Sequence, residues 1–215
     1  MENCELEYEE IQPYLLRVVY YVAYFNRIIK IKTAVTKGNN IDKSNIIQDE
    51  KKNNIVVVDE IRFMGRQNIK WREVEDFLKG YIGNHYEIID TSDLVFIGTD
   101  FPEELKGSED TKRLKGTNAK AKANATLKIP LLLKYATNKR WQENYKTKHG
   151  IDAKHGWYRF TSRFALPIYA NDGEIEKYSI FRIEMLMRHA ADGKLYLYDM
   201  VNVKKEKETG TPLGQ

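Results

Sequence analysis

Cysteine is almost absent from the chain, and this scarcity limits the class of protein. Cys4 is the only cysteine, so we expect no internal disulfide framework and no zinc site built from cysteines. Long apolar runs are missing too, since the most apolar stretch, residues 18–25, is far shorter than the roughly 20 residues of a membrane span. The opening MENCELEYEE is acidic, where an export signal would be basic. We therefore expect a cytoplasmic protein without a membrane span.

The glycine-rich and histidine-rich signatures of common enzymes are absent as well. The sequence contains no GxGxxG, GxxxxGK[ST], GxSxG or HExxH, which mark dinucleotide, nucleotide, acyl-transfer and zinc-hydrolase sites. His149 and Asp152 are three residues apart and His155 follows, but a third definite metal ligand is missing. We expect neither a metal nor another cofactor.

Positive charge is concentrated in one part of the chain. The whole sequence has 35 Lys+Arg and 31 Asp+Glu, a net charge of +4. Residues 106–163 alone contain 15 cationic and 4 acidic side chains, so the rest of the chain is acidic. A basic segment in an acidic chain indicates a surface for a polyanion. The alternative is a pair of solvated, lysine-rich helices.

The first half of the chain predicts helices, a linker and a strand. Residues 8–35 carry apolar side chains at helical spacing. Residues 36–54 are polar and asparagine-rich, which is typical of a linker. Residues 55–63 have the composition of a strand, and residues 69–83 place their large apolar side chains on one helical face.

Further helices are expected in the basic segment. Residues 85–90 and 93–98 predict a short hairpin before it. Ser108 is a plausible N-cap for the alanine- and lysine-rich residues 111–125. The lysines leave that helix little apolar surface, so we expect much of it to face solvent or an anion. Residues 129–146 predict a second helix, with Pro130 in its first turn.

The last third of the chain predicts strands. Three alternating apolar segments, residues 157–169, 174–189 and 194–205, are joined by the Asp172-Gly173 and Asp192-Gly193 turns. They predict a three-stranded antiparallel meander. The fold class expected from all the segments is α+β, with helices packed on one face of a small antiparallel sheet that ends in this meander.

The stretch HGIDAKHGWYRFTSR, residues 149–163, contains the densest group of reactive side chains. Histidine, arginine, lysine, tyrosine and hydroxyl groups together suit RNA cleavage without a metal. In that reaction the ribose 2′-OH attacks the adjacent phosphate, one group takes its proton and another protonates the leaving 5′ oxygen. Arginine is the best cation for the charge that develops on the phosphorane.

Strand alternation sorts these side chains onto two faces. One face is polar and cationic, and it carries Trp157, Arg159, Thr161 and Arg163. The opposite face, which we expect to be the core side, carries Tyr158, Phe160, Ser162 and Phe164. On the last strand, the polar face is expected to carry Tyr196, Tyr198, Met200, Asn202 and Lys204. The alternative is that Arg159 and Arg163 only pair with acids on a neighbouring strand, such as Glu174 or Glu184.

Four segments of the chain carry a resemblance to a known family: VFIGTDFPEELKGSEDTKRLKGTNAKAKANA, IPLLLKYATNKRWQEN, KHGIDAKHGWYRFTSRFALPIY and KLYLYDMVNVKKE. They resemble one family of phage- and mobile-element-associated nucleases with the barnase–EndoU–colicin–RelE-like (BECR) fold. The resemblance covers about residues 55–209. Its H-x-x-D-A-x-x-G-W-Y-R block matches His149 to Arg159, so His149 is preferred over His155. The resemblance implies a nuclease whose active site is the polar face of the meander.

These observations lead to a hypothesis of a metal-independent ribonuclease-like domain over residues 55–209. Residues 1–54 would be an N-terminal amphipathic helix and polar linker, and 210–215 a tail. Candidate catalytic residues are His149 as general acid or base, with Tyr158, Arg159, Thr161, Arg163 and Tyr198. Candidate nucleic-acid-binding residues are Lys112, Lys115, Lys120, Lys122, Trp157, Asn202 and Lys204.

The expected partners are RNA or DNA and an immunity, antitoxin or phage protein. Two alternatives stay open at this point. The chain could be a non-catalytic nucleic-acid-binding or phage-assembly module derived from such a nuclease. It could also be a toxin that a partner protein neutralises.

Overall fold

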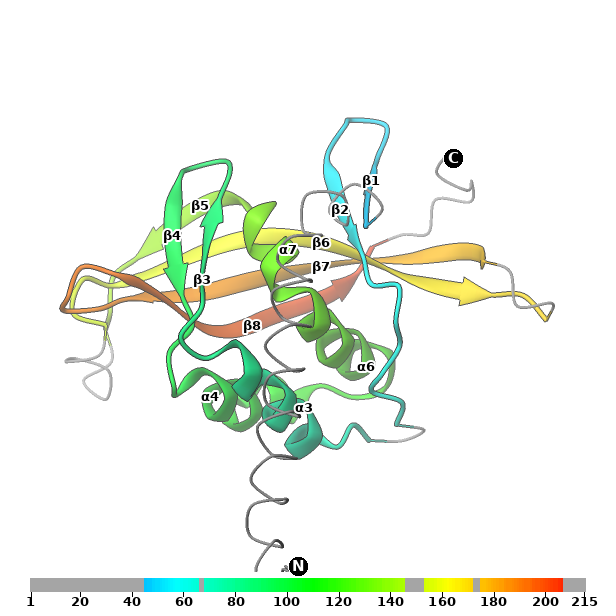
Figure 1. Ribbon diagram of the computed structural model, residues 1–215, viewed down its shortest axis with the longest axis horizontal. Coiled ribbons are helices and arrows are strands. Elements are labelled where there is room, and N and C mark those ends of the chain that lie inside the picture. Colours follow the sequence, from blue (N-terminus) through cyan, green and yellow to red (C-terminus); the bar gives the residue numbers. More distant parts are fainter. Residues whose placement is uncertain (1–44, 66–67, 146–152, 172–174, 207–215) are drawn as a thin grey trace, which may run out of the picture. The chain divides into compact units, whose positions relative to one another are not determined.

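The computed structural model describes residues 45–65, 68–145, 153–171 and 175–206 (Figure 1). The chain divides into two compact units, Met1–Ser44 and Asn45–Gln215, and all the described residues belong to the second. The helix expected at residues 8–35 and the tail at 210–215 lie outside the described residues. None of the helices in the described ranges is long and apolar enough to cross a membrane.

Most of the described chain belongs to one mixed sheet (Figure 1). Its strands are β1 (Ile46–Gln48), β2 (Asn54–Val57), β3 (His85–Ile88), β4 (Asp93–Phe96), β5 (Thr137–Gln142), β6 (Trp157–Tyr169), β7 (Ile175–His189) and β8 (Leu195–Lys205). Their order is β1-β2-β6-β7-β8-β4-β3, and β5 also pairs with β6. The β2–β6 and β4–β8 pairs are parallel, whereas the other pairs are antiparallel.

Short helices lie on one side of the long strands β6–β8 (Figure 1). They are α3 (Trp71–Leu78), α4 (Phe101–Gly107), α5 (Glu109–Arg113), α6 (Gly116–Ala125) and α7 (Ile129–Lys134), with 3₁₀ turns at Lys79–Tyr81 and Thr126–Lys128. Ser108 caps α5 as expected, because its hydroxyl accepts a hydrogen bond from the backbone N–H of Thr111 at 3.0 Å.

The expected fold class is wrong, because the sheet is larger and of mixed direction. The antiparallel strands β6, β7 and β8 are present where the turns predicted them, but they form only the middle of an eight-stranded sheet. Parallel neighbours on both sides join them to distant segments. Such pairings depend on residues far apart in the chain, so no local pattern reveals them.

Two segments expected to be other structures are strands. Residues 46–48, within the expected linker, form β1. Residues 137–142, expected to continue a helix, form β5. The helix stops at Lys134, and Asn138 has a φ of +56°, a left-handed conformation that breaks a right-handed helix.

The lysine-rich helix is also placed differently from the expectation. α6 packs under β8, and its side chains Ala121, Ala123 and Ala125 are fully buried. Small alanine side chains let the helix approach the sheet closely. Most of the second half of α6 therefore lies in the core and does not face an anion.

Alternation along β6 separates the core from the opposite face of the sheet. Phe160 and Phe164 are fully buried on the helix side, and Phe164 stacks on Phe181 of β7 with ring centroids 5.4 Å apart. Ser162, on the same side, donates a hydrogen bond to the carbonyl oxygen of Leu132 at 2.6 Å. The predicted core face of this strand is confirmed.

Candidate nucleic-acid interface

The sheet face directed away from the helices is here called the outer face. Over residues 157–163 of β6 and 182–188 of β7 it carries half-buried or exposed side chains. They are Trp157, Arg159, Thr161 and Arg163, and opposite them Arg188, Leu186, Glu184 and Arg182. Of the expected catalytic residues, Arg159, Thr161 and Arg163 therefore do share one face.

Three cations stand directly opposite one another on the outer face and form what we call the cation row. Arg163 of β6 is in register with Arg182 of β7, which is in register with Lys204 of β8. Side chains directly opposite in antiparallel strands lie about 5 Å apart at Cβ, and like charges there repel. Arg182 and Lys204 are exposed and have no ion-pair partner among the described residues. The row therefore offers two cationic groups to an anion.

Arg163 is neutralised by two carboxylates. Its Nη1 contacts Asp49 Oδ2 at 2.5 Å, and its Nη2 contacts Glu206 Oε2 at 2.6 Å. The Asp49 carboxylate is itself oriented by the backbone N–H groups of Lys51 and Asn53, each 2.9 Å away. Hydrogen bonds from Asn53 and then from Arg163 lower the pKa of Asp49. A phosphate that bound Arg163 edge-on would have to displace one of these carboxylates.

A cleft of about 640 Å³ opens beside the cation row. The β1–β2 turn forms one wall, and the other walls come from the start of β5, the middle of β6 and β7 and the end of β8. Lys51, Lys52 and Arg182 line the cleft, together with Tyr135 and Thr161. Four cationic and three acidic side chains line it in all. Its volume lies in the range of small-ligand pockets.

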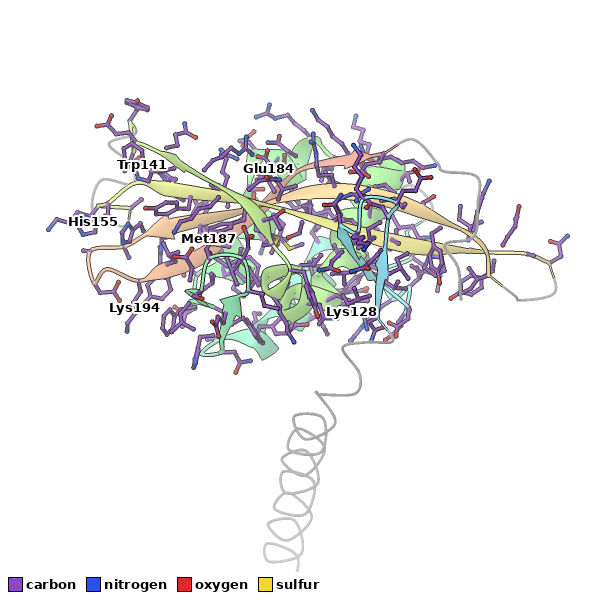
Figure 2. All side chains as sticks on the ribbon, turned by 90° about the horizontal axis from the view of Figure 1, so that it is seen from above. Lys128, Trp141, His155, Glu184, Met187 and Lys194 are labelled. Atoms are coloured by element: carbon purple, nitrogen blue, oxygen red, sulfur yellow. The ribbon has the colours of Figure 1, made fainter. Side chains whose placement is uncertain are left out.

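Glu184 joins three side chains in the middle of the outer face (Figure 2). It accepts hydrogen bonds from Arg140 at 2.6 Å, from Asn202 at 2.8 Å and from Arg159 at 3.3 Å. Burial by itself would raise the pKa of Glu184, but the bonds from Asn202 and Arg140 outweigh it and lower the pKa. Glu184 thus stays ionised, and Arg159 has the acid partner that the alternative interpretation proposed.

The last strand does not keep the simple alternation expected from the sequence. The β7–β8 register shifts twice, once between Arg182 and Glu184 and once between Leu186 and Met187. Asn202, with a φ of +56°, lies within the first shift. As a result Met200, expected on the polar face, is fully buried, whereas Lys204 is still directed to the outer face opposite Arg182. An extra residue in one strand reverses the faces of those that follow.

Tyr198 and Trp157 lie at the other end of the outer face. Their rings meet edge to face with centroids 4.9 Å apart. The Tyr198 hydroxyl donates a hydrogen bond to Glu104 Oε2 at 2.6 Å. Burial and this carboxylate raise the pKa of Tyr198, so the hydroxyl keeps its proton and serves as a hydrogen-bond donor.

Other expected site residues are not brought to the outer face. Tyr158 is on the core side, packed against the apolar core, with the Lys139 ammonium 4.6 Å from its ring centre. Lys112 is exposed and pairs with Glu109 at 3.1 Å. Lys115 is exposed and Lys120 half-buried, and both lie on the helix side.

The assignment of Lys122 to nucleic-acid binding is wrong, because its side chain is fully buried. Its ammonium contacts Asp199 at 3.0 Å and Asp110 at 3.1 Å. Burial raises the pKa of Asp199, and the Coulombic attraction and hydrogen bond of Lys122 oppose that rise. Lys122 therefore ties α6 to β8 and cannot reach a phosphate.

The proposed general acid or base, His149, lies outside the described residues, as does Asp152. His155 is exposed near the end of the sheet (Figure 2), where its ring lies 5.0 Å from that of His189. Neither of these two histidines is at the cleft.

Sequence reasoning missed Arg182, Arg140, Lys51 and Lys52. A usable signal existed for Arg182, because hairpin pairing through the 172–173 turn brings residues near 182 opposite those near 163. Lys51 and Lys52 gave no signal, because their segment resembles a linker. Comparison with protein-family models, curated proteins and solved structures finds no match for this chain.

Proposed function

We propose that the outer face of the sheet binds RNA, with the cation row and the lysines of the β1–β2 turn holding its phosphates. The observation that carries the proposal is the row itself. Three cations face one another in register, and only Arg163 has acidic partners among the described residues. Repulsion across the strands favours a bound anion at Arg182 and Lys204. An intracellular RNA as ligand would imply a cytoplasmic location.

The ribonuclease hypothesis extends this proposal to catalysis. Thr161 and Arg163 line the cleft, and a phosphate that displaced Asp49 from Arg163 would meet a guanidinium already oriented by Glu206. Cleavage by the 2′-OH also needs a proton acceptor and a proton donor. His149 is the candidate that the sequence offers for one of these roles.

Binding is tested by fluorescence anisotropy with a labelled single-stranded RNA at several salt concentrations. For single strands, the slope of log K against log salt is about −0.7 for each phosphate contact. The double variant Arg182→Ala/Lys204→Ala is expected to reduce this slope by about 1.4. Lys70→Ala is the matched control, because Lys70 is exposed, pairs with Glu73 and immediately precedes α3, away from the outer face. Equal salt slopes for the wild type and the double variant would refute the proposal.

Catalysis is tested by incubating the full chain with RNA in EDTA, beside the variants Arg159→Ala and Arg163→Ala. Products with a 2′,3′-cyclic phosphate that disappear in Arg163→Ala would support cleavage. Salt-dependent binding without products would instead support the non-catalytic module. Products that persist unchanged in both variants would exclude these arginines from the reaction.

A further inference from the structure

We propose that the far end of the outer face stacks unpaired bases, so that the ligand of this face is single-stranded. The site is a second cross-strand row, here called the aromatic row: Phe96, Tyr196, Arg188 and Trp157, with Tyr198 beside Trp157. The inference rests on the proposed function in taking a nucleic acid as the ligand. It adds how the bases are held and which form of nucleic acid fits.

The members of the aromatic row are consecutive partners across the sheet. Phe96 of β4 is in register with Tyr196 of β8, Tyr196 with Arg188 of β7, and Arg188 with Trp157 of β6. His85 of β3 continues the row on the other side of Phe96. Partners in register share a face of the sheet, so the rings and the guanidinium form one continuous strip over five strands.

The side chains of the strip also contact one another. Ring centroids are 5.4 Å apart for His85 and Phe96, and 5.8 Å apart for Phe96 and Tyr196. The guanidinium carbon of Arg188 lies 5.3 Å from the centre of the Tyr196 ring. All of these side chains are half-buried or exposed, and the Lys194 ammonium lies 5.0 Å from the centre of the Phe96 ring.

Carboxylates hold the polar ends of the strip in place. Asp192 accepts a hydrogen bond from the Tyr196 hydroxyl at 2.9 Å, and Glu104 accepts one from Tyr198 at 2.6 Å. Asp100 contacts Nη1 of Arg188 at 2.7 Å. Side chains oriented before binding lose less conformational entropy when a ligand binds. The side chains of the aromatic row are therefore oriented for stacking before a ligand binds.

The side chains of the aromatic row are of the types that stack on unpaired bases. Aromatic rings and arginine planes stack on bases of any sequence, and such stacking is a large part of single-strand binding. A duplex keeps its bases stacked internally, so a strip on a sheet face cannot reach their flat sides. The strip thus favours a single strand over a duplex of equal charge.

The aromatic row and the cation row lie on the same face at a suitable separation. Both rows cross β6, which contributes Trp157 to the aromatic row and Arg163 to the cation row. These two residues are six positions apart, which is about 20 Å at the rise of a strand. Stacked nucleotides advance about 3.4 Å each along the axis, so about six of them span this distance. Figure 2 shows the labelled Lys194, the residue before β8, well apart from Glu184. Phosphates at one end and bases at the other fit one oligonucleotide.

The test compares four labelled probes with the full chain: a single-stranded RNA of eight to ten nucleotides, an abasic strand of the same length, an RNA duplex and a neutral oligosaccharide. The wild type is expected to bind the single strand at least about tenfold more tightly than the abasic strand, the equivalent of about 1.4 kcal/mol. Tyr196→Leu is expected to weaken binding of the single strand about tenfold and to leave the abasic strand unaffected. Tyr169→Leu, at the exposed opposite end of β6, is the matched control and should bind as the wild type does.

The outcomes separate the two proposals. If the single strand, the abasic strand and the duplex bind equally, the aromatic row is not a base-binding site, although the cation row still binds phosphates. If no charged probe binds, the proposed function fails and this inference with it. Binding of the oligosaccharide that Tyr196→Leu abolishes would overturn the inference in favour of a glycan. Because the abasic comparison uses the unmodified protein, the test does not depend on the folding of any variant.

Discussion

Lys122→Met should be strongly destabilising, and the structure allows its cost to be worked out. Lys122 is fully buried, with its ammonium 3.0 Å from Asp199 and 3.1 Å from Asp110. Methionine has a similar length, so the change removes the charge with little loss of packing. It leaves the buried carboxylate of Asp199 with only the backbone N–H of Met200, at 2.7 Å, and Ser108 as compensation.

Removing one partner of a buried ion pair costs about 3–5 kcal/mol, because the other charge is left uncompensated. A domain of this size has an m-value of about 2 kcal/mol per molar urea. The midpoint of urea unfolding, measured by circular dichroism, should therefore fall by about 1.5–2.5 M. Lys115→Met is the matched control, because Lys115 is exposed, and its midpoint should barely change.

The cost should also depend on pH in a definite direction. Burial raises the pKa of Asp199, and loss of Lys122 removes the interactions that oppose this rise. A carboxyl group whose pKa is higher in the folded state than in the unfolded state stabilises the fold when it is protonated. The variant should therefore lose stability, relative to the wild type, as pH rises from about 4 through the raised pKa of Asp199. A loss under about 1 kcal/mol, or one that grew as pH fell, would refute the assigned role of Lys122.

Two further predictions concern the cleft and one turn. Asp49→Asn should remove a contribution to the free energy of unfolding that is fully present above the unfolded pKa of about 3.9, because the folded-state pKa of Asp49 is lowered. In urea titrations, the difference in stability between this variant and the wild type should shrink as pH falls below about 4. A difference that grew at low pH would contradict the Asp49–Arg163 contact. Gly156→Ala should destabilise the fold by roughly 1–3 kcal/mol, because Gly156 has a φ of +89° and a Cβ there would lie 2.7 Å from Trp141 Nε1 and 2.8 Å from the carbonyl oxygen of Gln142. Gly80→Ala is the control and should change the thermal midpoint little, because a Cβ at Gly80 would have nothing within 4 Å. Equal thermal midpoints for the two variants would contradict the close approach at Gly156.

Local signals in the sequence predicted local structure well. The Asp-Gly turns and alternating apolar residues predicted β6, β7 and β8, and the pairing of β6 with β7 follows from the turn between them. Ser108 was expected to be a helix cap from its residue type, and it caps α5. Alternation alone placed Arg159, Thr161 and Arg163 together and sent Phe160 to the core, because strand side chains have a period of two.

Residues far apart in the chain decided the rest of the site. Asp49 meets Arg163 across 114 residues, and Lys122 meets Asp199 across 77. Composition suggested that the lysines of α6 face an anion, but packing against the sheet buries Lys122 between two carboxylates. Two register shifts on β8 likewise decided which of its side chains reach the outer face.

The sequence by itself therefore determined which segments form the central strands and which face of β6 is polar. Only the tertiary structure decided that the polar face carries two cross-strand rows, one of cations and one of aromatic rings, and that carboxylates from distant segments neutralise some of its arginines. The physical reason is that the period of a strand is set by neighbouring residues, whereas register and ion pairing are set by contacts whose partners are separated by much of the chain.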